Sequence, residues 1–116
     1  MRILVFEDNL LWSSRLVHTL KALGHEPIVL KTAPDEIPLS AIAIVNLGST
    51  QLEPHLLVPR LRSLGIHVIG HAGHKEKDIL ELGRIAGCDT IATNSELTFK
   101  IESILDRING ALDSSS

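Results

Sequence analysis

The sequence contains few of the residues on which several classes of protein depend. Its 116 residues include one cysteine, two phenylalanines, one tryptophan and no tyrosine. A single cysteine excludes a disulfide within the chain and is typical of a reducing compartment. Because aromatic side chains are so few, the core must consist mainly of leucine, isoleucine and valine.

Charge and hydropathy exclude further classes of partner. The formal net charge is −3 and the basic residues form no stripe, so no direct contact with nucleic acid is expected. No apolar run approaches the length that crosses a membrane, and the first residues lack the pattern of a signal peptide. We therefore expect a cytoplasmic protein without a membrane partner.

Apolar segments of strand length alternate with segments of helical period, which predicts a parallel sheet with crossover helices. The expected strands are residues 2–6, 27–30, 41–45, 66–69 and 90–92. Helices are expected at residues 10–23, 54–64 and 76–86, and from about residue 94. Between residues 31 and 40, two prolines leave room for at most about one helical turn.

Each of these helices has an apolar stripe that predicts which side faces the sheet. In the 76–86 helix, Ile79, Leu82 and Ile85 are expected to point inward. The last helix has the clearest stripe, which includes Leu97 and Ile101, and Asn94 or Ser95 is expected to cap its start. The sequence favours one domain over residues 1–112, with residues 113–116 as a polar tail or the start of a linker.

Glu7 and Asp8 directly follow the first apolar run. The carboxyl end of such a strand lies where open parallel sheets bind their ligands. Adjacent carboxylates repel each other, and burying either is costly without a cation or donor nearby. The pair predicts either a site for a hard divalent cation such as Mg²⁺ or acids that cap backbone N–H groups.

Asn46 and His71 follow the third and fourth strands and are expected at the same edge as the two acids. His71 and His74 could hold Zn²⁺ together with a carboxylate, although their spacing matches no zinc finger. We also hypothesise that a protonated His71 lies against the acids as a built-in cation, with a raised pKa.

The run Ile3-Leu4-Val5-Phe6-Glu7-Asp8-Asn9 and the stretch Ala86-Gly87-Cys88-Asp89-Thr90-Ile91 resemble the receiver domain of bacterial response regulators in two-component signalling and phosphorelay. The resemblance covers almost the whole chain. It implies a three-layer αβα sandwich with a doubly wound, CheY-like sheet of order 2-1-3-4-5, here with a short or missing second crossover helix. It also implies a Mg²⁺ site on Glu7 and Asp8 and an aspartate phosphorylated by a histidine kinase.

The chain departs from this family at its chemical positions. The resemblance places the phospho-accepting aspartate at Asn46, the hydroxyl residue at His71 and the lysine at Asn94. A carboxamide has no anionic oxygen to attack phosphorus, so Asn46 cannot accept phosphate as an aspartate does. We therefore expect no catalytic residue, no enzyme activity and no resident cofactor, with Mg²⁺ as the alternative.

These departures favour an atypical receiver domain that acts as a phosphorylation-independent interaction or dimerisation module. The resemblance implies a partner surface on the fourth helix, fifth strand and last helix: Lys75, Lys77, Asp78, Glu81, Arg84, Thr98 and Glu102. The expected partners are a signalling protein, a fused output domain or a second copy. One alternative is a small α/β metal- or ligand-binding domain that uses Glu7, Asp8, Asn46 and His71. Another is a Mg²⁺-dependent receiver with a different acceptor residue.

Overall fold

The computed structural model describes residues 1–114, with side chains to residue 111. Its strands are β1 (Arg2–Phe6), β2 (Glu26–Leu30), β3 (Ile42–Asn46), β4 (His67–Ala72) and β5 (Thr90–Thr93). Its helices are α1 (Leu10–Ala22), α2 (Pro54–Ser63), α3 (Lys77–Ala86) and α4 (Asn94–Ser114), with a 3-10 turn at Thr50–Leu52. Helix α4 thus enters the predicted tail 113–116, whose last two residues lie outside the described part.

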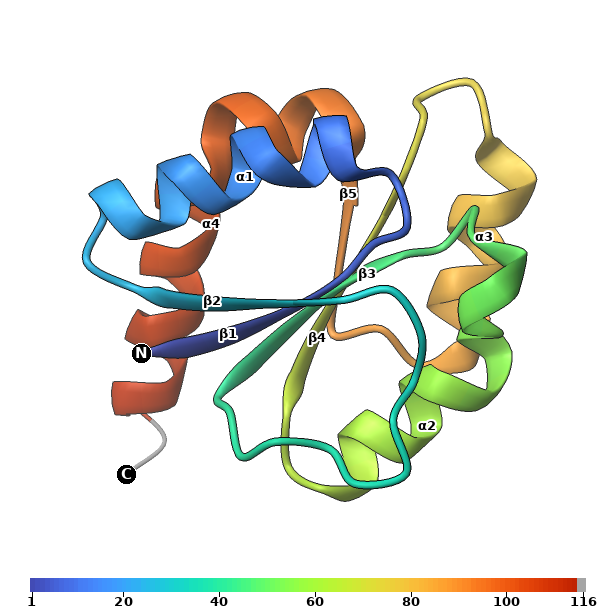
Figure 1. The fold of residues 1–116 in the computed structure, drawn as a ribbon, viewed down its shortest axis with the longest axis horizontal. Coiled ribbons are helices and arrows are strands. Elements are labelled where there is room, and N and C mark those ends of the chain that lie inside the picture. Colours follow the sequence, from blue (N-terminus) through green and yellow to red (C-terminus); the bar gives the residue numbers. More distant parts are fainter. Residues whose placement is uncertain (115–116) are drawn as a thin grey trace.

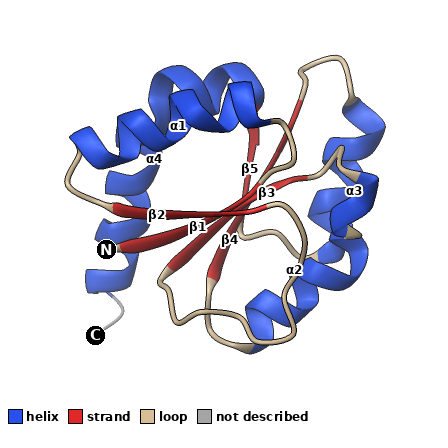
Figure 2. Cartoon of the chain, viewed as in Figure 1, coloured by secondary structure: helices blue, strands red, loops and turns tan. Residues whose placement is uncertain are grey.

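The strands form one parallel sheet in the order β2-β1-β3-β4-β5. Helices α1 and α4 cover one face and α2 and α3 cover the other (Figure 1). The connection between β2 and β3 contains no helix within this described stretch, and Figure 2 shows it as a long loop. The predicted three-layer architecture, its strand order and its missing second crossover helix are confirmed.

The apolar strands are buried on both faces because their side chains alternate between two cores. In β3, Ile42 and Ile44 pack with α1 and α4, whereas Ala43 and Val45 pack with α2 and α3. This alternation explains why continuous apolar runs, without polar positions, specify these strands. Because the strands run parallel, the carboxyl ends of β1, β3 and β4 lie at one edge.

The orientation predicted for α3 is confirmed for Ile79, which packs against the core, and is wrong for the other two residues. Leu82 and Ile85 are 64% and 69% exposed, and the small Gly83 faces the sheet instead. A Cβ atom at Gly83 would lie 2.3 Å from Leu47 Cδ1, so this glycine allows the helix to approach the sheet closely. The sequence contains two overlapping apolar stripes, and close packing selects the one with the smaller residues.

The start of α4 also differs from the prediction. Thr93, and neither Asn94 nor Ser95, makes the capping contacts: Glu96 N–H donates to Thr93 Oγ1 at 3.1 Å, and Thr93 N–H donates to Glu96 Oε1 at 3.0 Å. This reciprocal pair is a capping box. The side chain of Asn94 is therefore available for the site described next.

Candidate functional site

Asn46 is held in one orientation at the end of β3. Its Nδ2 donates to Glu7 Oε1 at 2.8 Å, and its Oδ1 accepts from the backbone N–H of Gly48 at 3.0 Å. Glu7 Oε1 also accepts from the N–H of Asn9 at 3.0 Å. Both ends of the carboxamide are thus used by neighbours from two loops.

The two predicted acids differ in their surroundings. Glu7 is 1% exposed, whereas Asp8 is exposed and accepts from Ser49 Oγ at 2.7 Å. Burial raises the pKa of the Glu7 carboxyl, although the donors from Asn9 and Asn46 lower it in part. The buried acid is therefore the one that the site pushes toward its neutral form.

His71 is buried between Glu7, Asn94 and Trp12. Its Nδ1 lies 2.7 Å from Asn94 Oδ1, and because that amide oxygen only accepts, Nδ1 carries the proton. The ring stacks on Trp12 with centroids 4.6 Å apart and planes 17° apart. Its Nε2 lies 3.6 Å from Glu7 Oε2 and has no hydrogen-bond partner among the described residues.

The hypothesis of a protonated His71 is contradicted. Burial lowers the pKa of this imidazole to about 4, and the hydrogen bond that it donates to Asn94 raises the pKa only in part. Desolvation therefore outweighs the effect of this hydrogen bond. In neutral His71, Nε2 is an unprotonated acceptor that lies 3.6 Å from Glu7 Oε2, and burial raises the pKa of this carboxyl.

Hydrogen-bond donors already occupy most of the side-chain oxygens that a divalent cation would use at this edge. Three of the five side-chain oxygens on Glu7, Asp8 and Asn46 already accept hydrogen bonds, from Asn46 Nδ2, Ser49 Oγ and Gly48 N–H. The other two are Asp8 Oδ1, on an exposed carboxylate, and Glu7 Oε2, on a carboxyl whose pKa is raised by burial. A hard cation needs anionic or free carbonyl oxygens, so it would have to displace these contacts.

The structure brings together most, but not all, of the predicted site residues. Four of them are in contact in series: Asn46 donates to Glu7, Glu7 lies 3.6 Å from His71, and His71 is hydrogen-bonded to Asn94. Asp8 directly follows Glu7 in the chain. His74 is exposed, and within the described chain no three His, Cys, Asp or Glu side chains are placed to hold a metal ion. The predicted zinc alternative with His74 therefore has no support.

The predicted partner residues lie on α3, on the loop before it and on α4. All are exposed except Thr98, which is half-buried and donates its Oγ1 hydrogen to Asn94 O at 2.8 Å. Glu81 and Arg84 form an ion pair on α3. Their role as a docking surface stays a prediction.

Trp12 and Ser49 belong to the site although the sequence did not identify them. Trp12 covers His71, and Ser49 fixes Asp8. The signal for Ser49 was its hydroxyl in the loop after β3, at the same edge as the acids. No comparable signal identified Trp12, since stacking depends on the angle at which α1 crosses the sheet.

Replacing Asn46 with aspartate is expected to destabilise the protein by about 1.5–3 kcal/mol near neutral pH. The change removes the donor to Glu7 and sets a second carboxylate against it. Urea unfolding with and without Mg²⁺ measures this, and Mg²⁺ should restore part of the loss because three carboxylates then converge. Asn46→Ala is the control, which loses the hydrogen bond but should not respond to Mg²⁺; equal stability of Asn46→Asp and the wild type would contradict the prediction.

No protein-family model and no curated protein match the sequence. Solved structures do match. A CheY-like response regulator receiver domain protein from Methanospirillum hungatei is 21% identical, with a TM-score of 0.74 over 95% of this chain and 97% of that one. The beryllofluoride-activated NtrC4 receiver domain dimer is 20% identical, with a TM-score of 0.75 over 99% of this chain and 98% of that one. The chain has the fold of response regulator receiver domains.

The receiver fold also occurs in a protein described as belonging to a family of redox sensors in the streptococci that evolved from two-component response regulators. That structure is 12% identical, with a TM-score of 0.70, and the match covers 99% of this chain and 55% of that one. At these identities the matches show the receiver fold alone. No helix in the described chain is both long and apolar enough to span a membrane.

Proposed function

We propose that this chain is an atypical receiver domain, which transmits a signal by binding other proteins and without accepting a phosphoryl group. The proposal depends most on Asn46, at the end of β3. This asparagine occupies the position where the receiver resemblance expects the aspartate that attacks the phosphoryl group. An amide has no anionic oxygen, and both ends of this one are engaged by Glu7 and Gly48.

The surroundings of Asn46 support the same conclusion. Asn94, where the resemblance expects a lysine, is bonded to His71 and supplies no positive charge for a phosphoryl group. His71 and the Trp12 ring above it fill the place of a small hydroxyl side chain. The alternative function, a metal- or ligand-binding site formed by Glu7, Asp8, Asn46 and His71, has less support. Most of these side chains already bond to one another or to their neighbours, so fewer polar atoms are free to bind a ligand.

Protein partners are the output that this proposal implies. The exposed charged residues of α3 and α4 offer a surface for a signalling protein, a fused output domain or a second copy. The NtrC4 receiver structure is a dimer, which supports dimerisation as one form of this output. Signalling would then depend on partner binding, abundance or another ligand.

Incubation with a small acyl phosphate and Mg²⁺ is expected to leave the mass of the intact protein unchanged. The physical reason is the missing oxyanion at Asn46. Intact-mass spectrometry checks this, with an authentic receiver domain as the positive control for the phosphodonor. The gain of one phosphoryl group on any residue of this chain would overturn the proposed function.

A further inference from the structure

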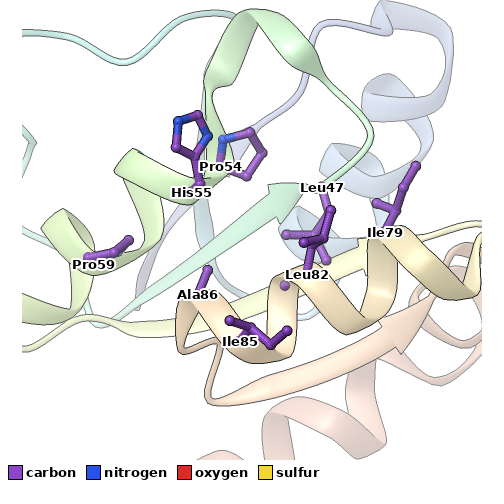
Figure 3. A pocket seen from close by; sticks show the side chains of 9 residues that line it. Leu47, Pro54, His55, Pro59, Ile79, Leu82, Ile85 and Ala86 are labelled. Carbon is purple, nitrogen blue, oxygen red and sulfur yellow. The ribbon is translucent and has the colours of Figure 1, made fainter.

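A groove between α2 and α3 is lined almost entirely by apolar groups (Figure 3). Pro54, His55 and Pro59 form the α2 side, and Leu82 and Ile85 stand on the α3 side. The groove has a volume of about 580 Å³. Pockets that bind small molecules in proteins have volumes of roughly 300–1,000 Å³ and mostly apolar linings.

The groove is formed before any ligand arrives. Its floor includes Leu47, whose side chain is held between Gly70 and Gly83: a Cβ atom at either glycine would lie less than 3.0 Å from it. Two proline rings form part of the wall, and proline has little side-chain freedom to lose on binding. A rigid wall lowers the entropy cost of binding a ligand.

The exposed apolar residues on α3 are concentrated at this groove. Leu82 and Ile85 are both more than half exposed, although the opposite side of α3 is packed on the sheet. Contiguous apolar surface of this kind on a soluble domain marks a site that binds something. A monomer without a ligand leaves these side chains in water.

His55 gives the groove its one polar side chain. Figure 3 shows its imidazole beside Pro54, across the groove from Leu82 and Ile79. A ring nitrogen of histidine carries a hydrogen in both protonation states, so it can donate to an acid group at any pH near neutrality. No acidic side chain is among the residues that line the groove.

We propose that this groove binds a small amphipathic molecule with an apolar body and an acid group. The apolar body lies against Ile79 and Leu82, and the acid group lies beside His55. We choose an acid group because His55 is the only hydrogen-bond donor among the lining side chains, and a carboxylate is a strong acceptor. The site is separate from the Asn46 edge, so this inference does not require the proposed function.

Octanoate and 1-octanol are suitable probes, since they share an apolar chain and differ in the acid group. Titration of the ¹⁵N-labelled protein with octanoate is expected to give saturable shifts on α2 and α3. 1-Octanol is expected to shift the same amides with weaker binding, because a hydroxyl is a weaker hydrogen-bond acceptor than a carboxylate for the N–H of His55.

Two substitutions test the two halves of the ligand. Leu82→Asp is expected to weaken octanoate binding about tenfold or more, because it places a carboxylate in the apolar wall. The control is Leu56→Asp, since Leu56 is 60% exposed on α2 but does not line the groove. His55→Ala is expected to weaken octanoate to the affinity of octanol while leaving octanol binding unchanged.

Three results would overturn the proposal: no saturable shift with octanoate, shifts confined to another face, or equal effects of Leu82→Asp and Leu56→Asp. A fourth is a concentration-dependent dimer in sedimentation experiments that Leu82→Asp converts to a monomer. That result would show that a second copy covers the groove. Phosphorylation of the chain by an acyl phosphate would refute the proposed function and leave this inference intact.

Discussion

Lowering the pH from 7 toward 4 is expected to remove up to about 3 kcal/mol of stability through His71 alone. The ordinary pKa of histidine is 6.5, and burial lowers that of His71 to about 4 in the folded protein. Between these values the unfolded chain binds more protons than the folded one, so stability falls as the pH falls. At about 1.4 kcal/mol per pH unit, the loss is complete near pH 4.

Glu7 acts in the opposite direction. Burial raises its pKa above the ordinary 4.5, so just above that pH the folded protein holds a proton that the unfolded chain has released. Lowering the pH through this range therefore favours the folded state through Glu7. The net loss of stability is consequently smaller than the His71 contribution.

Comparison of the wild type with His71→Gln isolates the histidine. Urea unfolding at pH 7 and pH 5 should show a shallower pH dependence for His71→Gln, even if this variant is less stable at both values. The wild type must be compared with this variant because burial also lowers the pKa values of His25 and His67, which add to the pH dependence of both proteins. NMR titration of the wild type gives the pKa directly, and a value for His71 above 6.5 would contradict the prediction.

Replacing Leu97 with alanine is expected to lower the free energy of unfolding by about 2–5 kcal/mol. Leu97 is 0% exposed and belongs to the core between the sheet and helices α1 and α4. The shortened side chain loses its contacts and leaves a cavity that the rigid strands cannot close. Thermal or urea unfolding measures the loss.

Leu11→Ala is the matched control for Leu97→Ala. It removes the same atoms from a helix, but Leu11 is 90% exposed, so its effect should stay within about 0.5 kcal/mol. If both variants lost the same stability, Leu97 could not be part of the core described above.

The fold could be predicted because its signals are local and repeated. The run Ile3–Phe6 and the run Ile42–Val45 are apolar at every position, as strands between two helical layers must be. The sequence also placed Glu7, Asn46 and His71 at one edge, since this follows from the direction of parallel strands.

Packing between elements could not be predicted in the same way. The choice between two stripes on α3 depends on the close approach that Gly83 permits. The neutral state of His71 depends on its burial under Trp12, which two distant segments create together. Thr93 caps α4 while Asn94 bonds to His71, a division of roles that the order of residues does not reveal.

Leu47 belongs to two surfaces at once. Its backbone N–H donates to His71 O at 2.9 Å, while its side chain forms part of the floor of the groove between α2 and α3. If a ligand in the groove moved this side chain, its binding would be coupled to the strand end that carries Asn46. Such an effect is reciprocal: the change in free energy that one site imposes on the other is returned in equal measure.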